Sequence, residues 1–489
     1  MLSNSPVANS NRQCWITVLT LVIVCSATCV AADRPNILFI AVDDLRPELA
    51  CYGKQHIVSP NIDELARTGV LFERSYCMVP TCGASRASLM TSVRPSPNRF
   101  VNYLAWAEKD AASAIPLHSH FKSNGYWTES LGKIFHHKAD HADGWSTPPW
   151  RSPKSGYQNT PQMKMDIRES KERFPNKKRH RGAPFEEFET ADESYPDGDC
   201  ARRAVQRIAM AAQAPETPFF IAVGFLKPHL PFNAPKRYWD MYSAEDIELP
   251  PNYRHPDDVP KTALHNSGEL RSYAGIHPTA AVDEATAKRL IHGYYACVSY
   301  TDAQIGKVLA ALEEYGVAEN TIVVLWGDHG WQLGEHGMWN KHSCFETSMH
   351  APLIMRIPKS IEGPTEAIAG GMRLTQLVEF IDIYPTLCDL AGLPTPSHVE
   401  GTSLVALMES PDSPGKPFAV GRYRAGDTIR SDQFRLSEFP VSGKNPKRES
   451  SEYMLFDHKA DPSEDRNVAT EAAEQVRALA AELQKRKGK

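Results

Sequence analysis

The sequence of 489 residues lacks the excess of positive charge that is typical of nucleic-acid-binding proteins. Its 54 Lys and Arg face 59 Asp and Glu, and the formal net charge is −5. Local cations or a metal ion would therefore have to hold an anionic ligand, and nucleic acid is not an expected partner. The absence of a C-x-x-C pair argues against a structural zinc site. No internal repeat is found, and 42% hydrophobic residues are typical of a globular protein with a large core.

The first apolar run is shorter than a membrane span. Arg12 precedes the apolar residues 15–24, and small residues follow at Ala31 and Ala32, which is the pattern of an export signal. A span needs about 20 apolar residues, so an uncleaved anchor is the less favoured alternative. We predict a signal peptide over residues 1–32, an exported product that is periplasmic or secreted, and no membrane span after cleavage.

The ten cysteines show no clear disulfide framework. Three of them precede residue 33, and the other seven are scattered: Cys51, Cys77, Cys82, Cys200, Cys297, Cys344 and Cys388. Because seven is odd, at least one cysteine of an exported protein would be unpaired or chemically special. Cys82 is the candidate, although a buried thiol without a chemical role is the ordinary alternative.

Short apolar strands alternate with amphipathic helices along most of the sequence. Residues 36–42, 219–224 and 321–326 are predicted to be buried strands, and Pro60 to Gly69 spans a helix with proline in its first turn. This alternation is typical of an α/β fold in which helices cover both faces of a doubly wound sheet.

Two long segments, 146–181 and 249–279, are rich in Pro, Lys and Arg. We expect both to be surface loops that wall a substrate cleft.

The composition changes after residue 396. Strands over 428–436 and 453–457 and a final helix over 468–485 predict a small C-terminal α+β subdomain. The predicted organisation is thus the signal peptide, a large domain over 33–395 and the subdomain over 396–489.

Acidic residues stand directly after two of the predicted strands. Asp43-Asp44 follows the first strand, and Asp328-His329 follows a later one. Open α/β sheets carry their sites beyond the carboxyl ends of strands, so the two pairs would converge. A set made mostly of carboxylate oxygens suits calcium or magnesium better than zinc, but because it includes an imidazole it does not decide which metal binds. A turn or a helix cap is the alternative for either pair alone.

Residues 82–86, Cys-Gly-Ala-Ser-Arg, resemble the signature C-x-[P/A]-x-R of the type I sulfatase family. The similarity extends from residue 34 to about residue 470 and includes these segments: 125–128, 132–136, 227–232, 327–330, 333–336, 339–341 and 455–462. Within that family the sequence is most similar to the iduronate-2-sulfatase branch, whose K-P-H-x-P-F and G-K-x-F-H segments it shares. The resemblance implies the alkaline-phosphatase-like fold, with a large mixed sheet between helices and a smaller C-terminal antiparallel sheet.

The resemblance also implies a sulfatase that uses Cα-formylglycine and one calcium ion. In that family a maturation enzyme oxidises the cysteine at the position of Cys82, and the hydrated aldehyde supplies an oxygen nucleophile. The implied metal ligands are Asp43, Asp44, Cys82, Asp328 and His329. The implied catalytic residues are Cys82, Arg86, Lys133, His136, His229 and Lys341.

The resemblance implies a role for each of these side chains. Arg86 would steady the formylglycine and the metal ligands, and Lys133 and Lys341 would contact sulfate oxygens. His136 and His229 would serve as general acid and base, in an order that the sequence leaves open.

A sulfated uronic acid of a polysaccharide, similar to iduronate 2-sulfate, is the implied substrate, as in glycosaminoglycan degradation. One alternative is a phosphate or phosphonate monoester hydrolase of the same superfamily. Another is an exported protein that binds sulfated glycans without catalysis. The sugar, endo or exo action and the oligomeric state stay open.

Overall fold

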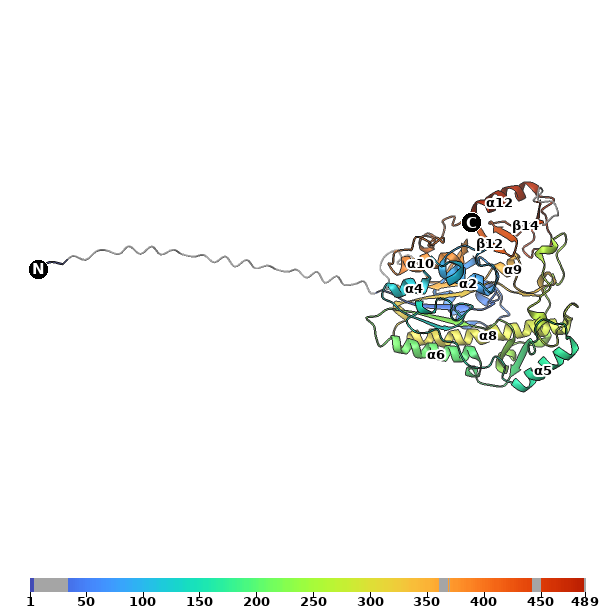
Figure 1. Cartoon of the computed structure of the whole chain (residues 1–489), viewed down its shortest axis with the longest axis horizontal. Coiled ribbons are helices and arrows are strands. Elements are labelled where there is room, and N and C mark those ends of the chain that lie inside the picture. Colours follow the sequence, from blue (N-terminus) through green and yellow to red (C-terminus); the bar gives the residue numbers. More distant parts are fainter. Residues whose placement is uncertain (4–33, 360–367, 369, 442–449, 488–489) are drawn as a thin grey trace. The chain divides into compact units, whose positions relative to one another are not determined.

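The computed structural model describes residues 1–3, 34–359, 368, 370–441 and 450–487. The signal peptide predicted over residues 1–32 lies outside the described residues, apart from the first three. From Arg34 onward the chain forms one compact unit (Figure 1).

A seven-stranded mixed sheet forms the centre of this unit, with the strand order β11-β2-β10-β7-β1-β5-β3. Its strands are β1 (Asn36–Val42), β2 (Val70–Tyr76), β3 (Trp127–Gly132), β5 (Phe219–Phe225), β7 (Thr321–Gly327), β10 (Leu353–Arg356) and β11 (Met372–Glu379). β1 pairs in parallel with both β5 and β7, so the carboxyl ends of these three strands reach the same edge of the sheet. The three strands predicted from apolar runs are confirmed.

Helices cover both faces of the sheet, as predicted. They are α1 (Pro60–Thr68), α2 (Cys82–Thr91), α4 (Leu117–Ser123), α6 (Pro196–Ala211), α8 (Glu284–Glu314) and α10 (Ile383–Leu390). α6 and α8 run along one face, and α2, α4 and α10 lie over the other (Figure 1).

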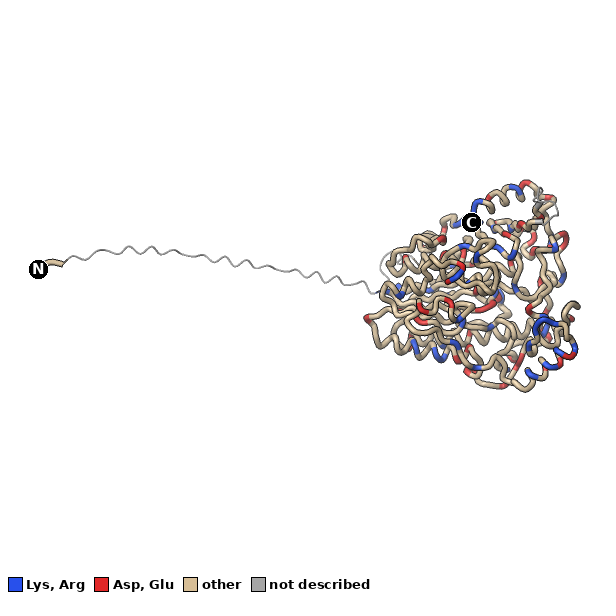
Figure 2. Tube along the Cα trace, in the orientation of Figure 1, with Lys and Arg blue, Asp and Glu red and all other residues tan. Residues whose placement is uncertain are grey.

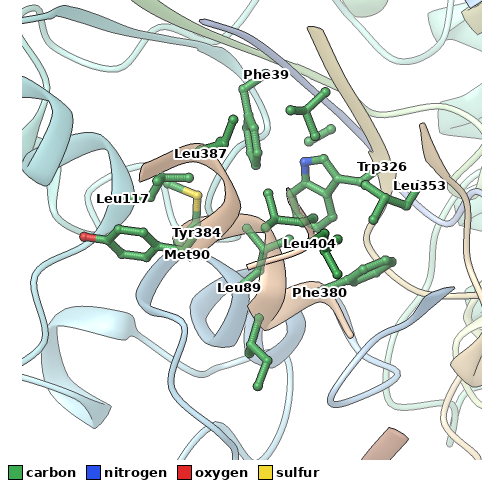
Figure 3. Packing of buried hydrophobic residues seen from close by; sticks show 14 of the residues in the cluster. Phe39, Leu89, Met90, Leu117, Trp326, Leu353, Phe380, Tyr384, Leu387 and Leu404 are labelled. Carbon is green, nitrogen blue, oxygen red and sulfur yellow. The ribbon is translucent and has the colours of Figure 1, made fainter. Parts of the chain in front are cut away.

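The alternation of side chains in β1 explains the two layers of helices. Phe39 belongs to one hydrophobic cluster, whereas its neighbours Leu38 and Ile40 belong to another, because successive side chains of a strand point to opposite faces. Figure 3 shows the first cluster, in which Phe39 and Trp326 from the sheet pack with residues of α2 and α10 such as Leu89.

A second, antiparallel sheet lies near the C-terminus, in the order β12-β13-β14-β15. Its elements are β12 (Ala419–Tyr423), β13 (Gly426–Arg430), β14 (Phe434–Val441), β15 (Ser450–Asp457) and the covering helix α12 (Ala473–Arg486). Val476, Leu479 and Leu483 of α12 pack on Ile429 and Leu436 of the sheet. The smaller C-terminal α+β layer is therefore confirmed, and the domain boundary at residue 396 stays a prediction.

Two predicted elements near the C-terminus differ from the structure. Residues 428–436 form parts of two strands rather than one, because the polar residues 431–433 turn the chain between β13 and β14. The last helix begins at Ala473 rather than 468. Asn467 holds the preceding chain out of the helix, since its Oδ1 accepts hydrogen bonds from the backbone N–H groups of Leu455 and Ala469.

The segment 146–181 is not the loop that was expected, because it contains the 14-residue helix α5 (Thr160–Arg173). Asn159 caps this helix by accepting a hydrogen bond from the backbone of Gln162 at 3.2 Å. The segment 249–279 holds only two 3-10 turns, Lys261–Ala263 and Leu270–Ser272.

The remaining elements are short. They are β4 (Phe185–Phe188), β6 (Phe232–Pro235), β8 (Gln332–Leu333), β9 (Trp339–Asn340), α3 (Ala107–Asp110), α7 (Lys236–Trp239), α9 (Glu346–Met349) and α11 (Val405–Glu409). Among the described helices, none combines the length and the apolar character that crossing a membrane requires.

Candidate active site

Three aspartates meet at the carboxyl edge of the central sheet. Asp43 and Asp44 follow β1, Asp328 follows the neighbouring β7, and all three are fully buried. Their carboxylate oxygens lie within 4.8 Å of one another. Asp44 has a left-handed backbone with φ 60°, and Tyr294 of α8 fixes it by donating a hydrogen bond to its carbonyl oxygen at 2.8 Å. The expected convergence of the two strand ends is therefore observed.

Cys82 lies beside these carboxylates as the first residue of α2. Its Sγ is 3.4 Å from Nε2 of His329 and 3.9 Å from Oδ1 of Asp44. Burial and the nearby Asp43 raise the pKa of the Cys82 thiol well above its ordinary value. A thiol that stays protonated is a poor nucleophile, so the unmodified side chain is not suited to attack.

The number of cysteines does not single out Cys82. All seven described cysteines are free, so their odd number does not distinguish any one of them. Its position distinguishes Cys82, because it is the only described cysteine in the candidate metal-holding groups.

Arg86 joins the two strand ends from one helical turn after Cys82. Its guanidinium is fully buried, with Nε 2.9 Å from Asp328 and Nη2 3.3 Å from Asp43. Nη1 donates to the carbonyl oxygens of Ile134, at 3.0 Å, and of Lys133. A lysine could not make these contacts in four directions.

Lys133 and Lys341 each contact a different one of these carboxylates. The ammonium group of Lys133 contacts Asp43, and that of Lys341 lies 2.9 and 3.0 Å from the two carboxylate oxygens of Asp44. The preceding residue, Gly132, lets Lys133 approach. It has φ 77°, and a Cβ at this position would lie 2.0 Å from a backbone oxygen of β5. Both lysines are nearly fully buried, so their charges act in a low dielectric.

His229 is held in place by its own segment. Asp197 of α6 accepts hydrogen bonds from the backbone of Leu226 and Lys227, and the Lys227 ammonium donates to the carbonyl oxygen of His229 at 2.8 Å. Nδ1 of His229 donates to the carbonyl oxygen of Leu230.

Glu269 is the site residue that the sequence did not reveal. Its carboxylate lies 3.1 Å from Nε2 of His229 and 3.1 Å from the ammonium of Lys341. It belongs to the irregular segment 249–279 and to none of the recognised motifs, so no pattern marked it. Nδ1 of His229 is bonded to a carbonyl oxygen, and its Nε2 faces the carboxylates of Glu269 and Asp44.

His136 lies apart from the carboxylates and forms no hydrogen bond or ion pair with the other candidates in the described structure. Its Nδ1 is buried without a hydrogen-bond partner, and its ring is 5.9 Å from that of Tyr103. Burial and the positive charge of Lys133 lower the pKa of His136 to about 3, so this imidazole is neutral. The neighbouring His137 stacks on Trp106 with ring centroids 4.4 Å apart.

The donor set fits a hard divalent cation. The carboxylates of Asp43, Asp44 and Asp328 form one group with metal-ligand spacing, and Asp44 forms a second with Cys82 and His329. Such an oxygen-rich set is the one that calcium or magnesium prefers. Burial raises the pKa of Asp44 even though His229 and Lys341 oppose the effect, and a bound cation would keep that carboxylate ionised.

A second acidic cluster, formed by Glu346, His458 and Glu464, also has metal-ligand spacing. Two arginines already compensate it, because Arg435 contacts Glu346 and lies 3.2 Å from Glu464, and Arg430 lies 3.3 Å from Glu346. This cluster is therefore an ion-pair network that attaches the C-terminal sheet.

Comparison with known proteins decides the family. The model of the sulfatase family matches residues 35–393. The chain belongs to the sulfatase family. A further family model, of the C-terminal region of N-sulphoglucosamine sulphohydrolase, matches residues 334–489. Human iduronate 2-sulfatase is 32% identical over 490 residues, covering 87% of this chain and 87% of that protein.

Solved structures agree on the fold. A protein solved with its substrate D-glucosamine-2-N,6-O-disulfate has a TM-score of 0.69 at 20% identity, over 92% of this chain and 98% of that one. The phosphonate monoester hydrolase of Agrobacterium radiobacter has a TM-score of 0.72 at 22% identity, over 92% and 95%. This sulfatase is thus a sulfuric ester hydrolase with the alkaline-phosphatase-like fold, close to the iduronate-2-sulfatase branch.

Proposed function

We propose that this sulfatase hydrolyses sulfate esters with a formylglycine formed from Cys82 and one calcium ion. The observation that carries the proposal is the buried group around Cys82, where three carboxylates meet two lysines and Arg86. The ion would be held by Asp43, Asp44, Asp328, His329 and the side chain at position 82. When bound, the ion would draw negative charge from the ester, and the hydrated aldehyde would supply the attacking oxygen.

The cations of the chain would bind the sulfate group. The buried ammonium groups of Lys133 and Lys341 contact the carboxylates beside position 82, where they would stabilise the charge that develops as the S–O bond breaks. Arg86 contacts the carboxylates and not the open side of the site, so its task is to fix the ligands in place.

The two histidines would divide the proton transfers. Nε2 of His229 faces the carboxylates of Glu269 and Asp44 at 3.1 and 3.8 Å, and we assign this ring as the acid that protonates the departing alkoxide. His136 is neutral and has a free ring nitrogen, so it would accept the proton when sulfate is released.

The relatives support a sulfated uronic acid in a polysaccharide as the substrate. Human iduronate 2-sulfatase covers most of the chain, and the K-P-H-L-P-F segment that holds His229 belongs to that branch of the family. The signal-like N-terminus favours export to the periplasm or the outside of the cell, and the maturation enzyme that oxidises Cys82 would be an obligatory partner.

Mass spectrometry of the tryptic peptide around Cys82, combined with sulfate release, tests this proposal. Active protein should show the aldehyde mass at position 82, and Cys82→Ala should release no sulfate. Parallel assays on phosphate and phosphonate monoesters distinguish the related hydrolases. Full activity with an intact thiol at position 82 would refute the mechanism.

A further inference from the structure

Residues 164–181, here called the basic tract, are strongly positive on an acidic protein. They contain eight Lys or Arg and only three Asp or Glu, whereas the whole chain has a formal net charge of −5. Among the described residues, none of these eight cations forms an ion pair with a carboxylate. Exposed cations on other helices do pair, as Lys485 does with Glu482 at 2.7 Å. The charge of the basic tract is thus not compensated by the protein.

The outer part of the basic tract is the exposed face of α5. Lys164, Arg168 and Lys171 are all exposed, and their spacing of four and three residues places them on one side of the helix. Figure 2 shows Lys and Arg gathered around α5 and the segment that follows it. Ser170 is the one buried residue of α5, so packing does not explain this row of cations.

The inner part of the basic tract reaches the rim of the active site. Arg179 donates a hydrogen bond to the hydroxyl of Tyr103 at 3.3 Å, and the Tyr103 ring lies against His136. The carbonyl oxygen of Tyr103 also packs so closely on the first turn of α2 that a Cβ on Gly83 would be 2.2 Å away.

The same part of the tract also contacts Tyr273, which lies close to Glu269 in the sequence. Lys177 donates to the carbonyl oxygen of Tyr273 at 2.7 Å, and Arg181 donates to its hydroxyl at 2.8 Å. Tyr273 stands four residues after Glu269, which contacts His229 and Lys341. The inner cations of the tract therefore contact two tyrosines that stand next to site residues in space or in sequence, and the cations of α5 directly precede them in the chain.

We propose that the basic tract is a binding site for the extended part of an anionic polysaccharide whose sulfate ester lies in the active site. The inference rests on the proposed function, since it takes the ester to be part of a polymer. Uncompensated cations attract repeated sulfate and carboxylate groups, and each contact would be modest and sensitive to salt because it is exposed. Longer chains would therefore bind more tightly than short ones.

Binding without turnover tests the tract directly. In a Cys82→Ala background, affinities for a disaccharide and an octasaccharide of a sulfated uronic-acid-containing glycan are measured by calorimetry. The triple variant Lys164→Gln, Arg168→Gln and Lys171→Gln should weaken octasaccharide binding about threefold to tenfold and leave disaccharide binding unchanged. Glutamine keeps the helix. The matched control variant neutralises exposed cations elsewhere: Lys54→Gln, Lys459→Gln and Arg477→Gln.

The outcomes separate this inference from the proposed function. Equal octasaccharide affinities for the two triple variants, or no preference of the parent for the octasaccharide, would overturn the basic tract as a binding site. Sulfate release from nitrophenyl sulfate by protein that retains Cys82 tests the chemistry by itself, and the α5 triple variant should keep it. Loss of octasaccharide affinity in the α5 triple variant, together with no sulfate release by protein that retains Cys82, would support the tract and refute the proposed function.

Discussion

Removing the charge of Glu269 should slow the release of a sugar alcohol far more than the release of a nitrophenolate. Glu269→Gln keeps the shape of the side chain, but an amide cannot accept from both His229 and Lys341 as the carboxylate does at 3.1 Å from each. Glu269 is a positioning residue, which orients the ring of His229 and the ammonium of Lys341.

The expected size follows from these contacts. A hydrogen bond to a charged group is worth about 1.5–3 kcal/mol, and the side chain of Glu269 is only 16% exposed. Loss of about 2–3 kcal/mol corresponds to a fall in kcat/KM of roughly 30- to 150-fold for a sulfated sugar. Nitrophenolate needs little protonation on departure, so its ester should lose less than about fivefold.

The assay compares kcat/KM on the two esters for the parent, Glu269→Gln and the exposed control Glu248→Gln, with Tm as a check of folding. The control should match the parent on both esters. A Glu269→Gln variant within about threefold of the parent on the sugar ester would refute the reasoning. An equal loss on both esters would show that Glu269 acts on sulfate binding through Lys341 and not on the leaving group.

Three further predictions concern the ligands and the stability. Arg86→Lys should destabilise the protein by about 3–5 kcal/mol, because it breaks buried ion pairs with Asp43 and Asp328; an unchanged Tm would contradict this. Chelation should abolish sulfate release and added calcium should restore it, whereas Asp328→Asn should not respond to calcium. Burial would raise the pKa of Glu379, but Lys416 and Arg94 outweigh it and lower the pKa to about 2. Because this value lies below the ordinary 4.5, the ionised Glu379 stabilises the fold above pH 4.5. Its contribution to the free energy of unfolding, up to about 3 kcal/mol, is lost as the pH falls toward 2. In urea unfolding, Lys416→Met should therefore show a weaker dependence of stability on acid pH.

The local part of the site could be predicted from the sequence. Asp43 and Asp328 stand at the ends of apolar strands, and parallel pairing of β1 with β7 brings such ends together. Cys82 and Arg86 are one helical turn apart, so their relation is fixed by local geometry. These positions depend on short-range rules that a sequence displays.

Other features could not be predicted because their cause is not local. Glu269 reaches His229 and Lys341 through an irregular segment without periodicity, and only the tertiary fold brings the three residues together. The helix α5 has one buried residue, so it lacks the apolar stripe that reveals a helix. The turn between β13 and β14 contains neither Gly nor Pro, so no breaker marks it.

The position of Cys82 bears on the order of events in biosynthesis. Cys82 is 2% exposed, and every residue of α2 is buried. An enzyme that oxidises this cysteine has to take the surrounding peptide into its own active site, which the folded chain does not permit. Under the proposed chemistry, oxidation precedes folding, and a molecule that folds first is trapped as an inactive thiol that only unfolding would return to the maturation enzyme.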